Sequence, residues 1–459
     1  AGGGALAAKG RPKRKPAGGG DQFLDPARNE VPVAGPAEFV GRRRATQAVL
    51  KAYRDGAAGV LIHGLGNLGK SSLAFRVSTR LTRHEKVVVF GKYDALSVLD
   101  RVVAALPPQE RKPAIDAWRN GVLADPGHLT YALEALLEGP LDAQPILLVV
   151  DDLERILETP RQSDAITPLQ AGYRAVLLAI LRAFQRAQTD SRLLITSRYR
   201  FSLPDSCGAD LAQELVCVPL QPMDDTEREK QLRAAARIAQ IDDLAGVDTA
   251  LLQRALDAAQ GNPGLQAALT RPVLAGENEV ARDALAAIEH FQTAGAPPER
   301  IRALIARGVA ADEANAMFAF FKRMAFDTYR MALTPGQAEM LQACCLFSSG
   351  LPIPRPAVEA AGQAAGVANP TAALDRLLGL GLVDDWGTEI AVAQGLRPGV
   401  SLVAVNPLAR PLAGRPAADS GARLASAALP ELDTFWRDAA GRYPRNPRAV
   451  EVARLALAV

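Results

Sequence analysis

The residues best placed to do chemistry lie in one glycine-rich stretch. Gly64 to Ser71 reads Gly-Leu-Gly-Asn-Leu-Gly-Lys-Ser, which fits the phosphate-binding spacing G-x-x-x-x-G-K-[ST]. Its glycines permit backbone conformations in which successive N–H groups point at phosphate oxygens. The Lys70 ammonium can then reach the β- and γ-phosphates, and the Ser71 hydroxyl can bind Mg²⁺. This chemistry predicts ATP or ADP, together with Mg²⁺, as cofactors.

The residues around this loop provide the setting that the motif requires. An apolar run at 60–62 predicts a buried strand before it. A helix is expected to begin near Lys70, where its dipole favours an anion. This order favours a nucleotide site over a plain glycine-rich turn. The expected phosphate-binding residues are Gly64, Gly66, Asn67, Leu68, Gly69, Lys70, Ser71 and Ser72.

Two carboxylates end a second apolar run. Residues 146–150 predict a central strand, and Asp151 and Asp152 follow it. A parallel strand beside the loop would deliver Asp151 to the Mg²⁺ region, where Ser71 is the other expected protein ligand. Asp152 or Glu154 could then orient the attacking water as catalytic residues. The simpler alternative is a strand followed by an aspartate helix cap.

Arg198 follows a further expected strand at 192–197. From the same sheet edge it would face the γ-phosphate and act in catalysis; the alternative is an ordinary surface arginine. With another strand expected at 214–218, strands alternating with helices predict a doubly wound parallel sheet over residues 30–222. The expected fold class is therefore an α/β P-loop NTPase.

The remaining pattern divides the chain into further parts. Residues 1–29 resemble a flexible linker, rich in glycine, proline and basic residues. A small helical domain is expected at 223–300 and a winged-helix domain at 301–415. Residues 416–459 predict a short helical segment that could begin a repeat sensor.

Charge and composition argue against several classes of protein. The net charge is +3, but residues 1–20 carry five basic residues and no acidic one, so removing these five leaves −2 for the rest. A body that is not basic argues against nucleic acid as a partner. The sequence has no run of 18 apolar residues, so no membrane span is expected. Four cysteines without metal-ligand spacing favour a cytoplasmic location.

Several motifs occur in the order found in one family. They are Phe39-Val40-Gly41-Arg42, Gly64 to Ser71, residues 146–152, Thr196-Ser197-Arg198 and Gly261-Asn262-Pro263, followed by a winged-helix pattern. Over residues 30–413 the sequence therefore resembles the STAND-class P-loop signalling ATPases of the NB-ARC type. The resemblance implies that Val40 and Arg42 line the adenine pocket and that Pro263 packs on the base. It also implies that Arg198 senses the γ-phosphate.

The resemblance further implies a function. Members of this class are switches that ADP keeps closed and that ATP opens for homo-oligomerisation, with slow hydrolysis. They lie between an effector domain and a helical-repeat sensor. The residues of these motifs are most similar to those of bacterial members, some of which carry a caspase-like (CHAT) peptidase and tetratricopeptide-like repeats. A role in bacterial defence or regulated effector activation is what this likeness implies.

One departure from the family concerns the winged helix, which normally presents a histidine to the β-phosphate of ADP. The sequence has no histidine after His290 and reads Val405-Asn406-Pro407 at the matching place. The Asn406 amide can donate to a phosphate, but it cannot titrate near neutral pH. Asn406 is therefore the candidate for this nucleotide contact, with a weaker ADP-locked state. Asn67 likewise replaces a glycine that is common in the middle of the loop.

Two other functions stay open. A STAND-type transcription regulator would bind DNA through its winged helix. However, residues 333–413 contain four arginines, no lysine and six acidic residues, whereas a groove-reading helix should be basic. This balance favours a winged helix that works within the chain. A fast-turnover motor would additionally need an arginine supplied by a neighbouring subunit.

Overall fold

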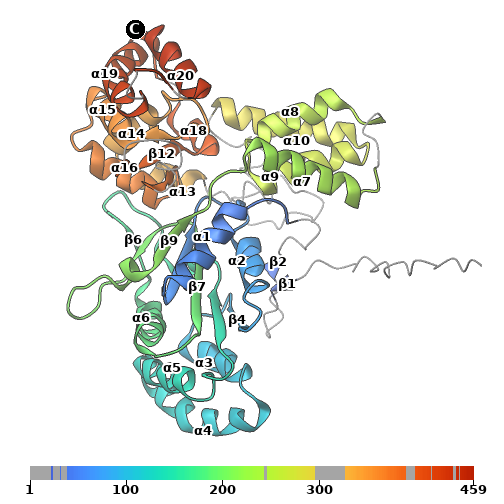
Figure 1. Ribbon diagram of the computed structural model, residues 1–459, viewed down its shortest axis with the longest axis vertical. Coiled ribbons are helices and arrows are strands. Elements are labelled where there is room, and N and C mark those ends of the chain that lie inside the picture. The colour runs from blue at the N-terminus through green and yellow to red at the C-terminus, as the bar shows by residue number, and fades with distance from the viewer. Residues whose placement is uncertain are drawn as a thin grey trace, which may run out of the picture.

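The structure is a computed structural model. It describes residues 22–23, 31–32, 39–241, 246–294, 326–388, 399–414, 416–437, 441–443 and 445–459. These residues form an α/β region, a four-helix region and a mostly helical C-terminal region with a small sheet (Figure 1). Most of the expected linker 1–29 lies outside the described residues. Within it, strand β1 (Gln22–Phe23) pairs antiparallel with β2 (Val31–Pro32).

The α/β region is built on one five-stranded sheet. Its strand order is β4 (Glu85–Val89), β5 (Ile146–Val150), β7 (Arg192–Ser197), β3 (Gly59–His63) and β9 (Val216–Pro219), and every pairing is parallel. The three central strands are apolar and buried along almost their whole length, as expected for a sheet covered on both faces. The predicted parallel α/β fold is therefore confirmed. Because the strands are parallel, their carboxyl ends meet at one edge.

Helices cover the two faces of this sheet according to the hand of each crossover. The connection from β3 to β4 contains α2 (Lys70–Ser78) and runs toward one end of the sheet. The connections from β4 to β5 and from β5 to β7 run the opposite way. Right-handed crossovers then place α2 on one face and the helices of the other two connections on the other face. These are α3 (Ala95–Ala104), α4 (Pro108–Ala124), α5 (Leu129–Glu138) and α6 (Ala171–Arg186). Helix α1 (Arg43–Arg54) packs on α2.

The four-helix region follows the last strand. Its helices are α7 (Asp225–Ile238), α8 (Thr249–Ala259), α9 (Pro263–Leu274) and α10 (Asn278–Ala294). Polar side chains fix three of their starts, because Asp224, Asp248 and Asn262 each accept a hydrogen bond from a backbone N–H of the first turn. Helix α9 lies centrally, in contact with the other three helices.

The C-terminal region combines helices with a three-stranded antiparallel sheet. The helices are α13 (Phe326–Ala332), α14 (Pro335–Cys344), α15 (Arg355–Ala364), α16 (Pro370–Gly379), α18 (Arg410–Ala413), α19 (Ala418–Trp436) and α20 (Asn446–Ala456). The sheet order is β10 (Ile353–Pro354), β12 (Leu402–Val405) and β11 (Val383–Trp386). The sequence pattern also predicts a strand near 389–393, which lies outside the described residues. Helix α19 packs along α15, so the expected segment 416–459 shares the core of this region. Within the described ranges, no helix is both long and apolar enough to cross a bilayer.

Candidate nucleotide-binding site

The glycine-rich loop connects β3 to α2, as the sequence predicts. Gly69 caps α2 with a left-handed backbone, φ 86°. At Gly64 the φ is 151°, and an added Cβ would lie 2.7 Å from the carbonyl oxygen of Leu220. Asn67 also adopts a left-handed backbone, φ 61°, which is uncommon for a residue with a side chain. The loop thus curves tightly between the carboxyl end of a central strand and the amino end of a helix.

Lys70 is buried at the first position of α2. Its Nζ donates to the carbonyl oxygens of Gly64 at 3.0 Å and Leu65 at 3.1 Å. Burial lowers the pKa of Lys70, an effect that the Glu154 carboxylate opposes and the Arg198 guanidinium reinforces. The ammonium therefore lies over the beginning of the loop, where a phosphate oxygen could replace either carbonyl as its partner.

Asp151 and Ser71 come together from β5 and α2. Asp151 is fully buried, and its Oδ1 accepts a hydrogen bond of 2.6 Å from the Thr196 hydroxyl. Burial and the neighbouring Asp152 raise the pKa of Asp151 to about 7, while the hydroxyls of Thr196 and Ser71 lower it. Its Oδ2 has no hydrogen-bond partner among the described residues. A buried carboxylate oxygen beside a hydroxyl is a donor set that fits Mg²⁺, which prefers hard oxygen ligands.

Asp152 follows Asp151 at the same edge of the sheet, in a more exposed position. Its backbone is left-handed, φ 54°, and its N–H donates to the Thr196 hydroxyl at 2.9 Å. The side chain is about one-third exposed and lies 3.6 Å from the Arg155 guanidinium. The Tyr93 hydroxyl donates to the carbonyl oxygens of Asp151 at 2.7 Å and Asp152 at 3.3 Å. Tyr93 was missed by the sequence analysis; its signal is a tyrosine four residues beyond an apolar strand.

Glu154 and Arg198 form a close ion pair. Arg198 Nε lies 2.8 Å from Glu154 Oε1, and the Arg198 backbone N–H donates to Oε2 at 3.2 Å. Burial alone would lower the pKa of Arg198, but Glu154 raises it above its ordinary value. The structure therefore brings these two predicted catalytic residues together. In this arrangement the carboxylate binds the arginine.

Arg42 is buried where several segments meet. Its guanidinium donates to the carbonyl oxygens of Leu68, at 2.9 Å, and of Gln221, and lies 3.9 Å from Glu227 of α7. Burial lowers the pKa of Arg42, and Glu227 raises it. Val40, two residues earlier, is half-buried. The predicted adenine contact of Val40 and Arg42 stays a prediction, while the link from Arg42 to the loop is direct.

The Gly-Asn-Pro-Gly turn before α9 packs on the same loop. Asn262 Nδ2 donates to the carbonyl oxygen of Gly66 at 3.1 Å. A Cβ added to Gly69 would lie 4.0 Å from Cγ of Pro263. Pro263 thus lies beside the phosphate loop. Its expected contact with the base of the nucleotide stays a prediction.

Asn406 is buried at the end of β12. Its Oδ1 accepts from the Leu408 N–H at 3.1 Å, and its Nδ2 donates to Asp384 at 3.3 Å. Burial raises the pKa of Asp384 to about 8, against the lowering effects of Asn406 and Arg42. The Asn406 amide therefore faces a carboxyl group in this arrangement, and its predicted contact with nucleotide stays a prediction.

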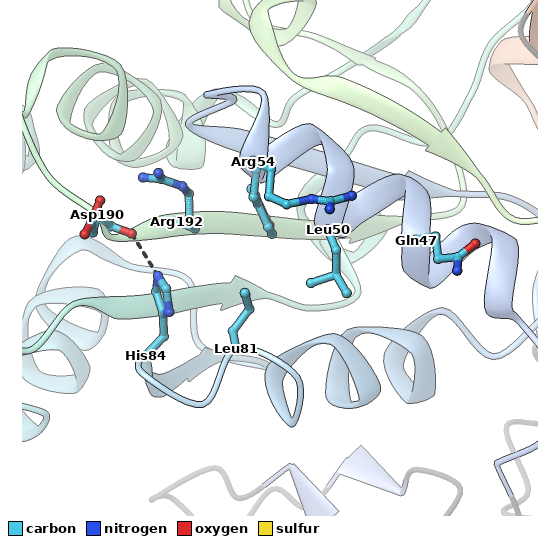
Figure 2. A pocket seen from close by; sticks show the side chains of 8 residues that line it. Gln47, Leu50, Arg54, Leu81, His84, Asp190 and Arg192 are labelled. Atoms are coloured by element: carbon cyan, nitrogen blue, oxygen red, sulfur yellow. Dashed lines mark hydrogen bonds between the residues drawn. The ribbon is translucent and has the colours of Figure 1, made fainter.

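A separate hollow of about 530 Å³ lies at the other end of the sheet (Figure 2). It is lined by α1 and by the turns that precede β4 and β7, where His84 Nε2 is 2.8 Å from the carbonyl oxygen of Asp190. These are the amino ends of the strands. The hollow therefore does not belong to the phosphate site, which lies at the carboxyl ends.

Comparison with known proteins agrees with this geometry. Residues 38–196 match a family profile described as an AAA ATPase domain. Over these residues the chain is therefore similar to AAA-type P-loop ATPase domains. Such domains bind nucleotide, usually with Mg²⁺, and hydrolyse it. No curated protein matches the chain.

Several solved structures resemble the chain at low identity. A Walker-type ATPase of Pyrococcus abyssi is 12% identical with a TM-score of 0.43, over 83% of this chain and 98% of that one. A STAND protein with a tetratricopeptide repeat sensor from Pyrococcus horikoshii is 14% identical, with a TM-score of 0.27, over 91% of this chain and 48% of that one. Domain III of the replication initiation protein DnaA of Thermotoga maritima is 14% identical, with a TM-score of 0.32, over 64% and 100%.

The position of Lys70 leads to a binding prediction. Lys70→Ala removes the buried charge at the start of the loop, and we expect ATP affinity to fall roughly ten- to hundred-fold, as for a lost charged hydrogen bond. A fluorescent ATP analogue titrated into both proteins measures this. Arg80→Ala, an exposed change just beyond α2, is the matched control. Equal affinities for the Lys70 variant and the parent would contradict the site.

Proposed function

We propose that the chain is an ATP/ADP-dependent switch of the STAND type, closed with ADP and open with ATP, in which hydrolysis is slow. The observation that carries the proposal is that the C-terminal region is docked on the carboxyl edge of the ATPase sheet. Arg200 lies 3.3 Å from Asp385 of β11, and its N–H donates to the carbonyl oxygen of Gly379 at 2.8 Å. The Gln221 amide donates to the Asp385 carbonyl at 3.0 Å. A region that touches the nucleotide loop can respond to what the loop holds.

The winged-helix interpretation of this region supports the same function. The described residues give helices α14 to α16, with the short strand β10 between the first two, followed by strands β11 and β12. This order is compatible with a winged helix. The arginine of α16 is engaged by the α/β region, since Arg376 is buried and donates to the carbonyl oxygen of Arg161 at 3.0 Å. This burial disfavours the DNA-binding alternative, because a helix that reads a groove must present its cations to solvent.

The Glu154–Arg198 pair supports slow hydrolysis. A carboxylate that is bound by an arginine is less available to orient water. Opening with ATP, homo-oligomerisation, a linked effector domain and a repeat sensor complete the proposal by analogy with the class. A cytoplasmic location and a role in bacterial defence rest on the same analogy.

The nucleotide content of the purified protein tests the switch directly. We expect protein prepared without added nucleotide to release ADP on denaturation, in close to one equivalent, measured by mass spectrometry. The closed arrangement should hold the diphosphate against dilution. Release of no nucleotide at all would count against the proposal, and release of ATP alone would contradict the assignment of the closed state.

A second prediction separates binding from hydrolysis. Asp152→Asn keeps the shape of the side chain and removes the charge that could orient water, so ATP should still bind while turnover falls by roughly 10²–10⁴-fold. Phosphate release and analogue binding measure the two effects. Asp125→Asn, an exposed change between α4 and α5, is the control. Unchanged phosphate release would exclude a catalytic role for Asp152 and leave Glu154 as the candidate.

A third prediction concerns Asn406. Asn406→Ala removes a buried cap and the bond to Asp384, and so should loosen the docked region and speed ADP release roughly ten-fold or more. Asn369→Ala removes a comparable cap, that of α16, and serves as the control. Asn406→His, which restores the residue of the family, should slow release, most clearly below pH 7 where imidazole gains charge. Stopped-flow release of labelled ADP decides this: equal rates for all four proteins would remove Asn406 from the site.

A further inference from the structure

The turn between α16 and β11 lies directly against the phosphate loop. Gly381 is its left-handed residue, φ 72°. A methyl group added there would lie 3.3 Å from the backbone nitrogen of Leu65, 3.5 Å from the carbonyl carbon of Gly64 and 3.3 Å from the carbonyl oxygen of Arg198. The turn thus lies between the start of the loop and the end of β7, so closely that a side chain at Gly381 would be crowded by backbone atoms of both.

This position is on the γ-phosphate side of the site. In this motif the loop N–H groups hold the α- and β-phosphates of a nucleotide, whereas the lysine reaches the β- and γ-phosphates. In this structure Lys70 Nζ is bonded to the carbonyls of Gly64 and Leu65, the two loop residues that Gly381 touches. Arg198, the third neighbour of Gly381, is the predicted γ-phosphate sensor. The turn therefore borders the place where we expect the γ-phosphate, the one phosphate by which ATP differs from ADP.

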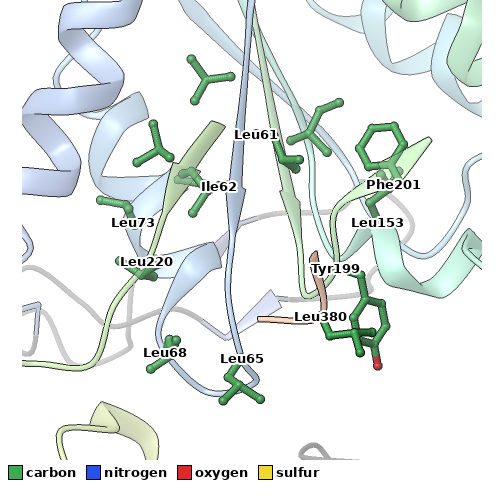
Figure 3. Packing of buried hydrophobic residues seen from close by; sticks show 14 of the residues in the cluster. Leu61, Ile62, Leu65, Leu68, Leu73, Leu153, Tyr199, Phe201, Leu220 and Leu380 are labelled. Atoms are coloured by element: carbon green, nitrogen blue, oxygen red, sulfur yellow. The ribbon is translucent and has the colours of Figure 1, made fainter. Parts of the chain in front are cut away.

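The turn is held firmly in this place. Leu380 is fully buried and belongs to the same core cluster as Leu65 of the loop; both are labelled in Figure 3. On one side Arg200 binds Gly379 through its backbone and Asp385 through its side chain. The turn and the loop thus meet through backbone atoms and buried leucines. Such a contact is stiff, because close-packed interiors have low compressibility.

We propose that the Gly381 turn is the element that discriminates between the two nucleotides. When docked it occupies the border of the γ-phosphate position, so it accepts a nucleoside diphosphate and disfavours a triphosphate. ATP must then displace the turn, and with it the whole C-terminal region. This inference rests on the proposed switch and assigns its nucleotide specificity to a backbone contact, in place of a titrating side chain.

A pair of glycine substitutions tests the proposal. Gly381→Ala adds a methyl group to the contact and strains a left-handed backbone, so the docked state should be weakened. Gly387→Ala imposes the same strain at φ 64° in the same region, but a Cβ there meets nothing within 4 Å. We expect the ratio of ATP to ADP affinity to rise roughly ten-fold for Gly381→Ala, because the added methyl group crowds backbone atoms of the loop only when the turn is docked. The same ratio should stay at the parent value for Gly387→Ala.

A second variant covers the case in which Gly381→Ala does not fold, which circular dichroism would report. Asp385→Asn removes the charge that pairs with Arg200 and keeps the bond from Arg200 to His63, the residue before the loop. It should raise the same ratio in the same direction. Titration of labelled ATP and ADP into each folded protein gives the ratios. If Gly381→Ala or Asp385→Asn shows the ratio of the parent, or if Gly387→Ala shifts it equally, the turn is not the specificity element. Failure of the parent to bind either nucleotide would instead overturn the proposed function.

Discussion

A buried guanidinium has to be surrounded by oxygen atoms, and in this chain those atoms come from different parts of the fold. Arg42 is 7% exposed, and a charge this far from water is tolerated only when it is bonded on most sides. The phosphate loop supplies the Leu68 carbonyl, the segment after β9 supplies the Gln221 carbonyl, and α7 supplies Glu227. Asp384 of the C-terminal region adds its field. If any of these segments moves away, the buried guanidinium loses one of its partners. Arg42 therefore couples the positions of these segments.

The parallel sheet turns separate sequence motifs into one site. The strands before the loop, before Asp151 and before Arg198 lie side by side in the order β5, β7, β3. Since all three run the same way, their following residues meet at one edge, which is where ligands bind in sheets of this kind. The Thr196 hydroxyl shows how close this convergence is, because it binds Asp151 and the Asp152 backbone at once. A hydroxyl at the end of one strand thus fixes both carboxylate residues of the next.

The parts of this arrangement that could be predicted are those with a local pattern. The loop spacing and the apolar strands predicted the α/β sheet, and the polar residues that follow each strand predicted which side chains meet. The contacts of Glu227 and Gly381 had no such pattern, because each depends on chain segments that are distant in sequence. The last strand was expected at 214–218 but begins at Val216. Asp210 binds the N–H of Ala212 there and starts a 3₁₀ turn through Glu214, a local competition that apolar content does not reveal.

The left-handed residues around the loop have a consequence for anyone who wishes to engineer this chain. Within the described ranges five residues other than glycine have a positive φ, and three of them, Arg42, Asn67 and Asp152, belong to the site. Such backbones cost stability and persist where the surroundings enforce them. Glycine at Asn67 would relax the chain locally, and a search for thermostable variants would select it. Glycine is common at this place in the family that the sequence resembles, so that change is compatible with a phosphate loop. At Arg42 and Asp152, by contrast, the same change would remove side chains of the site, so thermostability and nucleotide recognition are in conflict at those two positions.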